Sequence, residues 1–239
     1  MGHGRLAARA ASRDRSFRRA DAGRRTACHT VAGVTEWYRT PDWDAEARAD
    51  FGQRLSRARG QRSEYLRLKG QALQDAGLLD EAAGMYERLL AEHPNDVSVS
   101  FVQELLGDVA RARGRLEEAA RRYRHLLTLR PLLDSSGMVE VSLTEVLLEL
   151  GQPDEAAGAL AEVDEQSLAT FNSKLFRYLV TCARVASARG DAESAASTAA
   201  HALDLVNAPR QYSRHPTVGL VETDAATTTM LQALARAVR

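Results

Sequence analysis

The chain has 239 residues, with 32 basic and 32 acidic side chains and therefore no net formal charge, and 44% of its residues are hydrophobic. This composition is ordinary for a globular protein with a sizeable buried core. No apolar run is long enough for a membrane-spanning helix, the N-terminus lacks the apolar segment of a secretory signal, and two cysteines are too few for a disulfide framework, so we expect a cytoplasmic protein.

Residues 1–33 form an Arg-rich tail with few large apolar residues and no helical periodicity, for which we predict disorder. Residues 1–40 carry nine arginines and three acids, so the rest of the chain carries the opposite net charge. Three interpretations are open. The tail is an arm that binds nucleic acid or another anion, an Arg-rich transit peptide, or an inert stretch included by a start codon placed too early.

Residues 34–62 are predicted to be an N-terminal capping region. Thr40 is a candidate N-cap, Pro41 suits the first helical position, and apolar residues recur at helical spacing over 41–58. Both tryptophans of the chain, Trp37 and Trp43, lie in this short region. We interpret it as a cap over the open end of the helices that follow, with an aromatic docking surface as the alternative.

A set of sequence marks recurs with one period through the middle of the chain, which indicates internal repeats. In the first copy a helix with an apolar stripe stops at Gly77, because glycine adopts the left-handed conformation at little cost. Acids follow in the first turn of a second helix, where they suit the helix dipole. Ala82 and Tyr86 come next, and Pro94 ends the unit. The marks return at intervals of 37 residues as Gly114, Ala119, Tyr123 and Pro131, then as Gly151, Ala156 and Leu160.

These marks predict four two-helix units, at about 63–96, 100–133, 137–170 and 176–207, of which the fourth is degenerate. Residues 208–222 are predicted to be a loop, and residues 223–239 a C-terminal capping helix that begins at Thr223 or Asp224. The loop is long for an ordered connection. One hypothesis is that its Tyr212, Val218 and Leu220 fold back across the units and occupy their binding groove.

The repeated pattern resembles the tetratricopeptide repeat, which has a small residue in its first helix, a glycine turn, Ala-x-x-x-aromatic in its second helix and a closing proline. The matching residues are Gly70, Gly77, Ala82, Tyr86 and Pro94, and then Gly107, Gly114, Ala119, Tyr123 and Pro131. The period of 37 residues exceeds the family's value of about 34, and Lys69 stands where an apolar residue is usual. The resemblance covers residues 63–207. It implies an all-α fold, a right-handed α-solenoid of helix-turn-helix repeats with helical caps.

The sequence holds no motif for catalysis, for a cofactor or for a metal. Phosphate-cradling glycine loops, Gly-x-Ser-x-Gly, His-Glu-x-x-His and Cys-x-x-Cys are all absent. Acid pairs at 80–81, 117–118 and 154–155 recur at the repeat period in the first turn of each second helix, which favours a helix-dipole role over acid/base catalysis. Cys182 is interpreted as a small buried hydrophobe. We therefore expect no enzymatic activity.

The resemblance implies that the first helices of the units line a concave face and that their outward positions contact a ligand. The groove residues predicted in this way are Arg67, Gln71, Gln74, Phe101, Glu104, Asp108, Arg111, Val141, Glu145, Glu149 and Arg184. The Lys and Asn side chains with which one subclass holds a C-terminal carboxylate are absent from the matching places. The middle of this groove is acidic, which favours a partner segment with basic and apolar residues. The alternative is a solvated charged face.

The expected function is that of a non-catalytic adaptor or scaffold that binds another protein or a peptide through this face. The alternative is a regulatory helical repeat protein, peptide-sensing or transcription-linked, that touches nucleic acid through residues 1–33. No DNA-binding helix-turn-helix is visible, so we do not expect nucleic acid to be the partner. We expect neither a membrane partner nor a cofactor.

Overall fold

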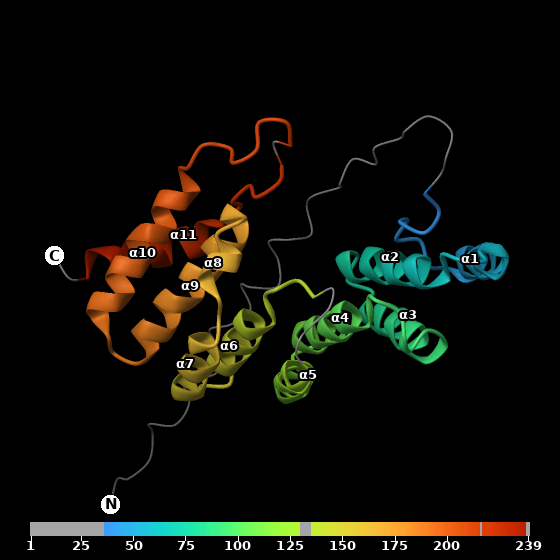
Figure 1. Ribbon diagram of the computed structural model, residues 1–239, viewed down its shortest axis with the longest axis horizontal. Helices are drawn as coiled ribbons and strands as arrows, with labels where there is room; N and C mark the ends of the chain where they lie inside the picture. Colours follow the sequence, from blue (N-terminus) through green and yellow to red (C-terminus); the bar gives the residue numbers. More distant parts are fainter. Residues whose placement is uncertain (1–35, 130–134, 216, 238–239) are drawn as a thin grey trace, which may run out of the picture. The chain divides into compact units, whose positions relative to one another are not determined.

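The computed structural model describes residues 36–129, 135–215 and 217–237, and all the helices found there lie in one compact unit that begins at Trp37. The predicted tail of residues 1–33 and Pro131 lie outside the described residues. Within them the chain forms eleven α-helices and no strand (Figure 1). The helices are α1 (Ala45–Arg57), α2 (Arg62–Asp75), α3 (Leu79–Glu92), α4 (Val99–Ala112), α5 (Leu116–Thr128), α6 (Val139–Glu149), α7 (Pro153–Ala161), α8 (Glu165–Leu168), α9 (Asn172–Ala188), α10 (Ala192–Val206) and α11 (Ala225–Arg236).

The helices pack as consecutive pairs, each against the next. α2 packs on α3, α4 on α5, α6 on α7 and α9 on α10, and the pairs are joined through α3 with α4, α5 with α6, and α6 and α7 with α9 (Figure 1). This arrangement confirms the predicted all-α fold of stacked helix pairs. The short helix α8 was not predicted. It places Leu168 in a small core cluster with Met138 and Val141.

The turn inside each pair depends on a glycine in the left-handed region. Gly77, Gly114, Gly151 and Gly190 have φ angles of 78°, 73°, 72° and 79°. At Gly77, Gly114 and Gly151 these values confirm the prediction made from the repeat marks, because glycine has no Cβ and adopts this conformation without a steric clash. The chain reverses at these four points and lays each second helix against its first helix.

Each of the first two pairs is held together by a tyrosine that lies on a glycine. Tyr86 and Tyr123 are completely buried, and a Cβ atom on Gly107 would lie 2.5 Å from Cε1 of Tyr123, with the same overlap between Gly70 and Tyr86. In the third pair the corresponding positions are Thr144 and Leu160, and in the fourth they are Ala183 and Ala199. A larger residue on the first helix is thus matched by a smaller residue on the second helix. This exchange in size accounts for the weaker sequence marks of the last two units.

Helix α1 begins later than the sequence predicted. Its N-cap is Asp44, whose Oδ1 accepts a hydrogen bond of 2.8 Å from the Ala47 amide, so the prediction of Thr40 as the N-cap is wrong. The backbone carbonyls of Thr40 and Asp42 instead accept hydrogen bonds of 2.6 and 3.0 Å from Nζ of Lys69 in α2. Those carbonyls therefore face a cation and do not begin a helix.

Lys69 fastens the N-terminal segment to the first pair. Its side chain is buried, with Nζ 5.0 Å from the ring centre of Trp43 and 5.7 Å from that of Phe51. Burial lowers the pKa of this ammonium group, and the charge of Asp42 partly opposes the shift. Trp37 packs on Phe51 as well, with ring centres 5.3 Å apart. A residue that departs from the repeat pattern thus connects two parts of the fold.

We expect replacement of Lys69 with methionine to destabilise this segment by about 1–2 kcal/mol, because two backbone carbonyls lose a charged donor. Since Trp37 and Trp43 are the only tryptophans of the chain, intrinsic fluorescence during urea denaturation reports on this segment directly. Replacement of the exposed Arg57 of α1 with methionine is the control. An unfolding midpoint shared by the wild type and the Lys69 variant would contradict the role of Lys69.

The C-terminal helix α11 packs on α10 and α9, and its N-cap is Asp224, as one of the two predicted alternatives had it. The loop before it docks beside the start of α9. Gln211 accepts a hydrogen bond from the Asn172 amide, and the hydroxyl of Tyr212 donates to the Thr170 carbonyl. Val218 and Leu220 are 40% and 43% exposed. The hypothesis that this loop lies across the groove is therefore wrong.

No described helix meets the length and hydropathy that a membrane span requires.

Candidate functional site

The candidate site is the surface formed by the first helix of each pair, α2, α4, α6 and α9, which we call the first-helix face. Its central part is a polar network that joins three of these helices. The network consists of Glu104, Asp108 and Arg111 on α4, Ser142, Glu145 and Glu149 on α6, and Arg177 and Thr181 on α9. Five of these eight residues were predicted groove residues, and the structure brings them together.

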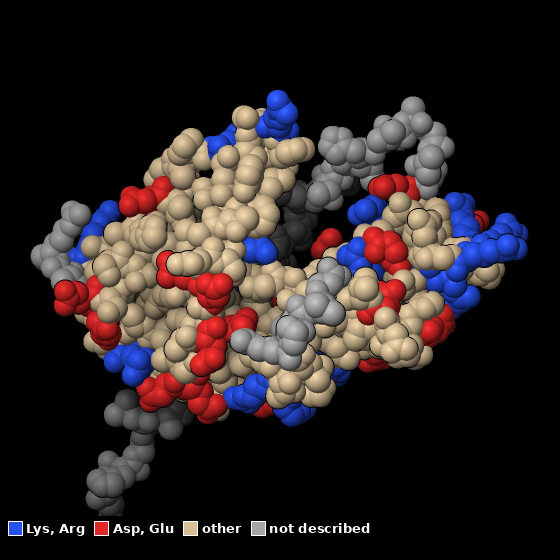
Figure 2. Space-filling model, in the orientation of Figure 1, with Lys and Arg blue, Asp and Glu red and all other residues tan. Residues whose placement is uncertain are grey.

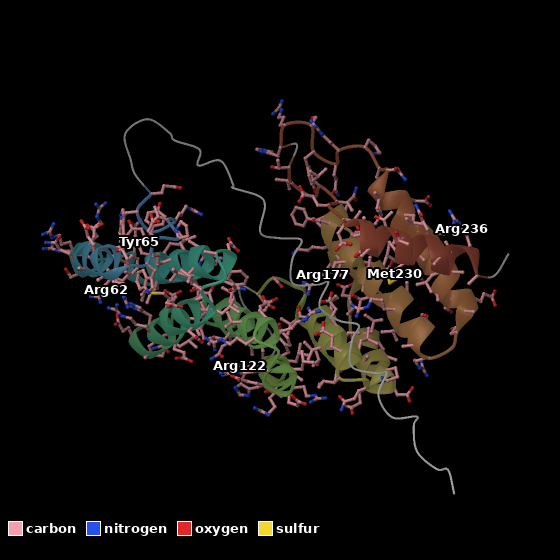
Figure 3. The ribbon with its side chains drawn as sticks, turned by 180° about the vertical axis from the view of Figure 1, so that it is seen from behind. Arg62, Tyr65, Arg122, Arg177, Met230 and Arg236 are labelled. Atoms are coloured by element: carbon pink, nitrogen blue, oxygen red, sulfur yellow. The ribbon has the colours of Figure 1, made fainter. Side chains whose placement is uncertain are left out.

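Glu145 is the centre of the network. Its carboxylate accepts hydrogen bonds of 2.8 and 2.9 Å from Nε and Nη2 of Arg177, and it also pairs with Nη1 of Arg111. Burial alone would raise the pKa of the Glu145 carboxyl, but the hydrogen bonds and charges of Arg177 and Arg111 outweigh it and lower the pKa to about 2. Figure 3 shows Arg177 near the middle of the molecule, and its ion pair with Glu145 joins α9 to α6.

Arg111 extends the network from α4 to two acids of α6. Its guanidinium pairs with Glu145 and donates a hydrogen bond of 3.0 Å from Nε to Oε1 of Glu149. Glu145 and Glu149 are four residues apart on one helix, a spacing at which like charges repel. The cation from the neighbouring pair lies between them and removes that repulsion.

Glu104 and Asp108 are satisfied by other groups of the chain. Glu104 is 3% exposed and accepts hydrogen bonds from the amide, 3.0 Å away, and the hydroxyl of Ser136. Asp108 accepts a hydrogen bond of 2.5 Å from the Tyr123 hydroxyl. Burial raises the pKa of both carboxyls, and these hydrogen bonds oppose the shift.

At the α2 end of the face, Arg67, Gln71 and Phe101 form a second group. Arg67 donates a hydrogen bond of 3.1 Å to Gln71, pairs with Glu64, and holds its guanidinium carbon 5.7 Å from the ring centre of Phe101. Gln74 accepts a hydrogen bond of 2.9 Å from the hydroxyl of the buried Tyr86. This part of the face is more open than the network, because Arg67, Gln71, Gln74 and Phe101 are all partly exposed.

Two predicted groove residues have other surroundings. Val141 is completely buried and packs in the core with Met138 and Leu168, so the structure places it beneath the face. Arg184 is half-buried and, within the described part of the chain, has no hydrogen bond or ion pair. The burial of Val141 could have been predicted from the α6 sequence, because a helix that is largely apolar all round is normally enclosed.

No group of three or more His, Cys, Asp or Glu side chains among the described residues is placed to hold a metal ion. An open cleft of about 430 Å³ beside α7 and α9 is lined by small and apolar residues together with Tyr178, Cys182, Arg189 and Asp191. Burial, more than any other influence, raises the pKa of the Cys182 thiol to about 11. A thiol that stays protonated near neutral pH is a weak nucleophile.

Comparison with known proteins agrees with this architecture. A family model described as tetratricopeptide repeat matches residues 104–135. A tetratricopeptide repeat protein from Parabacteroides merdae has a similar fold, with a TM-score of 0.53 and 17% sequence identity over 79% of this chain and 65% of that one. A double mutant described as MamA RS-1 ArsTM matches with a TM-score of 0.49 and 18% identity over 75% of this chain and 97% of that chain. No curated protein sequence matches.

Residues 104–135 are thus similar to the tetratricopeptide repeat, and the described helices form an array of consecutively packed pairs. The family model confirms the resemblance seen in the sequence, and the Parabacteroides merdae structure agrees with it in fold. The present chain spans 65% of the length of that protein. Tetratricopeptide repeats generally mediate protein–protein interaction.

Proposed function

We propose that the chain is a non-catalytic adaptor or scaffold that binds another protein or a peptide along the first-helix face. The observation that carries this proposal is the polar network. It joins α4, α6 and α9 through two ion pairs of Glu145. One is with Arg111, 34 residues earlier in the sequence, and the other is with Arg177, 32 residues later. A surface that is rigid before binding loses less conformational entropy when a partner docks.

The alternative interpretation, a charged face that merely contacts water, explains the network less well. Partial burial of a charged group costs desolvation free energy. Charged residues on a fully solvated face do not incur this cost, because they extend into water. Here Glu145 is 10% exposed as a side chain, while Arg177 and Glu149 are 40% and 33% exposed. The face therefore combines a buried ionic framework with partly exposed groups that a partner can reach.

The structure changes the basis of the predicted charge preference. The sequence predicts a basic partner segment because Glu104, Asp108, Glu145 and Glu149 make the middle of the groove acidic. Each of them accepts hydrogen bonds from other groups of the chain. We therefore propose the partner class, a protein or peptide, without a preference for basic residues.

The alternative function, regulation with nucleic acid contacted through residues 1–33, stays a prediction, because that tail lies outside the described residues. Exposed arginines in and just after α1, among them Arg48, Arg57 and Arg59, continue the basic part of the sequence (Figure 2). The cytoplasmic location also stays a prediction.

The proposal is tested by affinity capture with the tagged full chain from cells that produce it naturally. We expect a partner that is retained by the wild type and whose retention falls about tenfold or more on replacement of Phe101 with alanine, because half-buried aromatic residues are among those that contribute most to the affinity of an interface. Replacement of the exposed Arg121 in α5 with alanine is the control. A partner lost with Arg121 and retained without Phe101 would contradict the proposal, provided that both variants unfold cooperatively.

A further inference from the structure

The charged side chains of helix α9 are all cations. Its 17 residues include Lys174, Arg177 and Arg184 and no acid, whereas α6 carries three glutamates and no cation. Arg177 and Arg184 are seven residues apart, which places them on the same side of the helix about 10 Å apart along its axis. Lys174 lies one turn before Arg177. The three cations therefore form a short row along α9.

On α9, several N–H donors have no partner among the described residues. Both carboxylate oxygens of Glu104 and of Glu145 are already occupied by donors of the chain. Arg177 uses Nε and Nη2 and leaves Nη1 without a partner in the described residues. Arg184 is unpaired there.

Lys174 also has hydrogen-bond donors without a partner among the described residues. Its ammonium group has three protons but donates only one hydrogen bond, of 2.7 Å, to the Ser136 carbonyl, and it lies 5.4 Å from the ring centre of Phe171. A ligand at this row can satisfy the free N–H groups only by bringing acceptors, and it gains most when those acceptors are charged.

We propose that α9 recognises an acidic segment of the partner polypeptide, with carboxylates bound by Lys174, Arg177 and Arg184. The proposal rests on the proposed function and specifies the chemistry of the segment. Half-buried Val180 lies between Arg177 and Arg184 in sequence, which suits an apolar side chain between acids. An extended peptide advances about 3.3 Å per residue, so acids about three residues apart match the spacing of the two arginines. A nucleic acid backbone offers acceptors but no such apolar group.

The test is selection of random twelve-residue phage-displayed peptides on the full chain, followed by fluorescence anisotropy with a labelled peptide from the selected set. We expect the set to be rich in Asp and Glu. The double variant Lys174→Gln, Arg184→Gln is expected to bind about tenfold more weakly or worse, since hydrogen bonds between charged groups are strong. Arg177 is left unchanged because Glu145 depends on it. The matched control is Arg121→Gln, Arg124→Gln on α5, which removes the same charge.

Selected peptides that are basic or neutral, or equal binding by the α9 variant and the wild type, would overturn this inference while leaving the proposed function intact. Tighter binding of a labelled oligodeoxythymidine than of any selected peptide, lost in the α9 variant, would assign the row to nucleic acid and also overturn it. If no peptide is enriched and affinity capture finds no partner that depends on Phe101, the proposed function fails as well.

Discussion

Replacing Glu145 with glutamine is expected to lower the free energy of unfolding by about 2–3 kcal/mol. Removing one partner of a buried ion pair costs about 3–5 kcal/mol, because the other charge stays buried and unpaired. The expected loss is somewhat smaller here, since the side chains of Arg111 and Arg177 are 25% and 40% exposed and gain some solvation from water. Urea denaturation followed by circular dichroism measures the change.

The matched control is replacement of Glu149 with glutamine. Glu149 lies on the same helix and pairs with the same arginine, but its side chain is 33% exposed. Exposed ion pairs contribute about 0–1 kcal/mol, so we expect a small effect. Equal losses for the two variants would show that Glu145 is not the buried centre of the network.

The effect of Glu145 is also expected to depend on pH. Its pKa in the folded chain is lowered to about 2, below the value of about 4.3 for an unfolded glutamate. The ionised carboxylate therefore stabilises the fold above about pH 4.3, and this contribution is lost as the pH falls from there toward 2. We expect the stability difference between wild type and the glutamine variant to shrink over that range. Glu104 and Asp108 have raised pKa values, and burial, the main cause of the rise, is common to both chains.

The second large effect is expected from Gly107. Replacement with alanine should destabilise the fold by about 1–3 kcal/mol, as overpacking of a filled core does, because the new methyl group would overlap the ring of Tyr123. That ring is completely buried and has little room to move. The same result is expected for Gly70 against Tyr86. Thermal and urea unfolding of the single variants measure both effects.

Two further variants keep this prediction testable. Gly84 in α3 has no neighbouring atom within 4 Å of a new Cβ, so its replacement with alanine is expected to stabilise the fold by about 0.5–1 kcal/mol. Adding Tyr86→Leu to Gly70→Ala copies the size order of Thr144 and Leu160 in the third pair, and it should recover part of the loss. If Gly84→Ala and Gly70→Ala had the same effect, the proposed contact between glycine and tyrosine would be refuted.

The repeat marks predicted the helix pairs because the marks act locally. A glycine ends a helix at its own position, and acids stabilise the turn in which they lie, so neither depends on distant residues. Thr40 failed as an N-cap for the opposite reason. Its carbonyl is held by Lys69, 29 residues further along the chain, and no local pattern reports that contact.

The composition of the face could be predicted only in part. Spacing on a helix placed Glu104, Glu145 and Arg111 on one side, but it could not show that Arg111 and Arg177 would pair with Glu145, or that Ser136 would donate hydrogen bonds to Glu104. The pairing of Arg177 with Glu145, which are 32 residues apart in sequence, depends on how α9 packs against α6. Charge counted helix by helix therefore predicted a groove of free acids, whereas in the folded chain Arg111 and Arg177 pair with Glu145, and Lys174 and Arg184 lie on the same helix as Arg177.

The central claim, that a partner docks on the first-helix face, is tested most directly by site-specific photo-crosslinking in the native cell. A photoreactive phenylalanine analogue is placed at Phe101 on α4 or at Val180 on α9, and as controls at the exposed Arg121 on α5 or Glu87 on α3. The proposal predicts that one partner is crosslinked from both positions on the face and from neither control. A partner crosslinked only from α3 and α5 would contradict it.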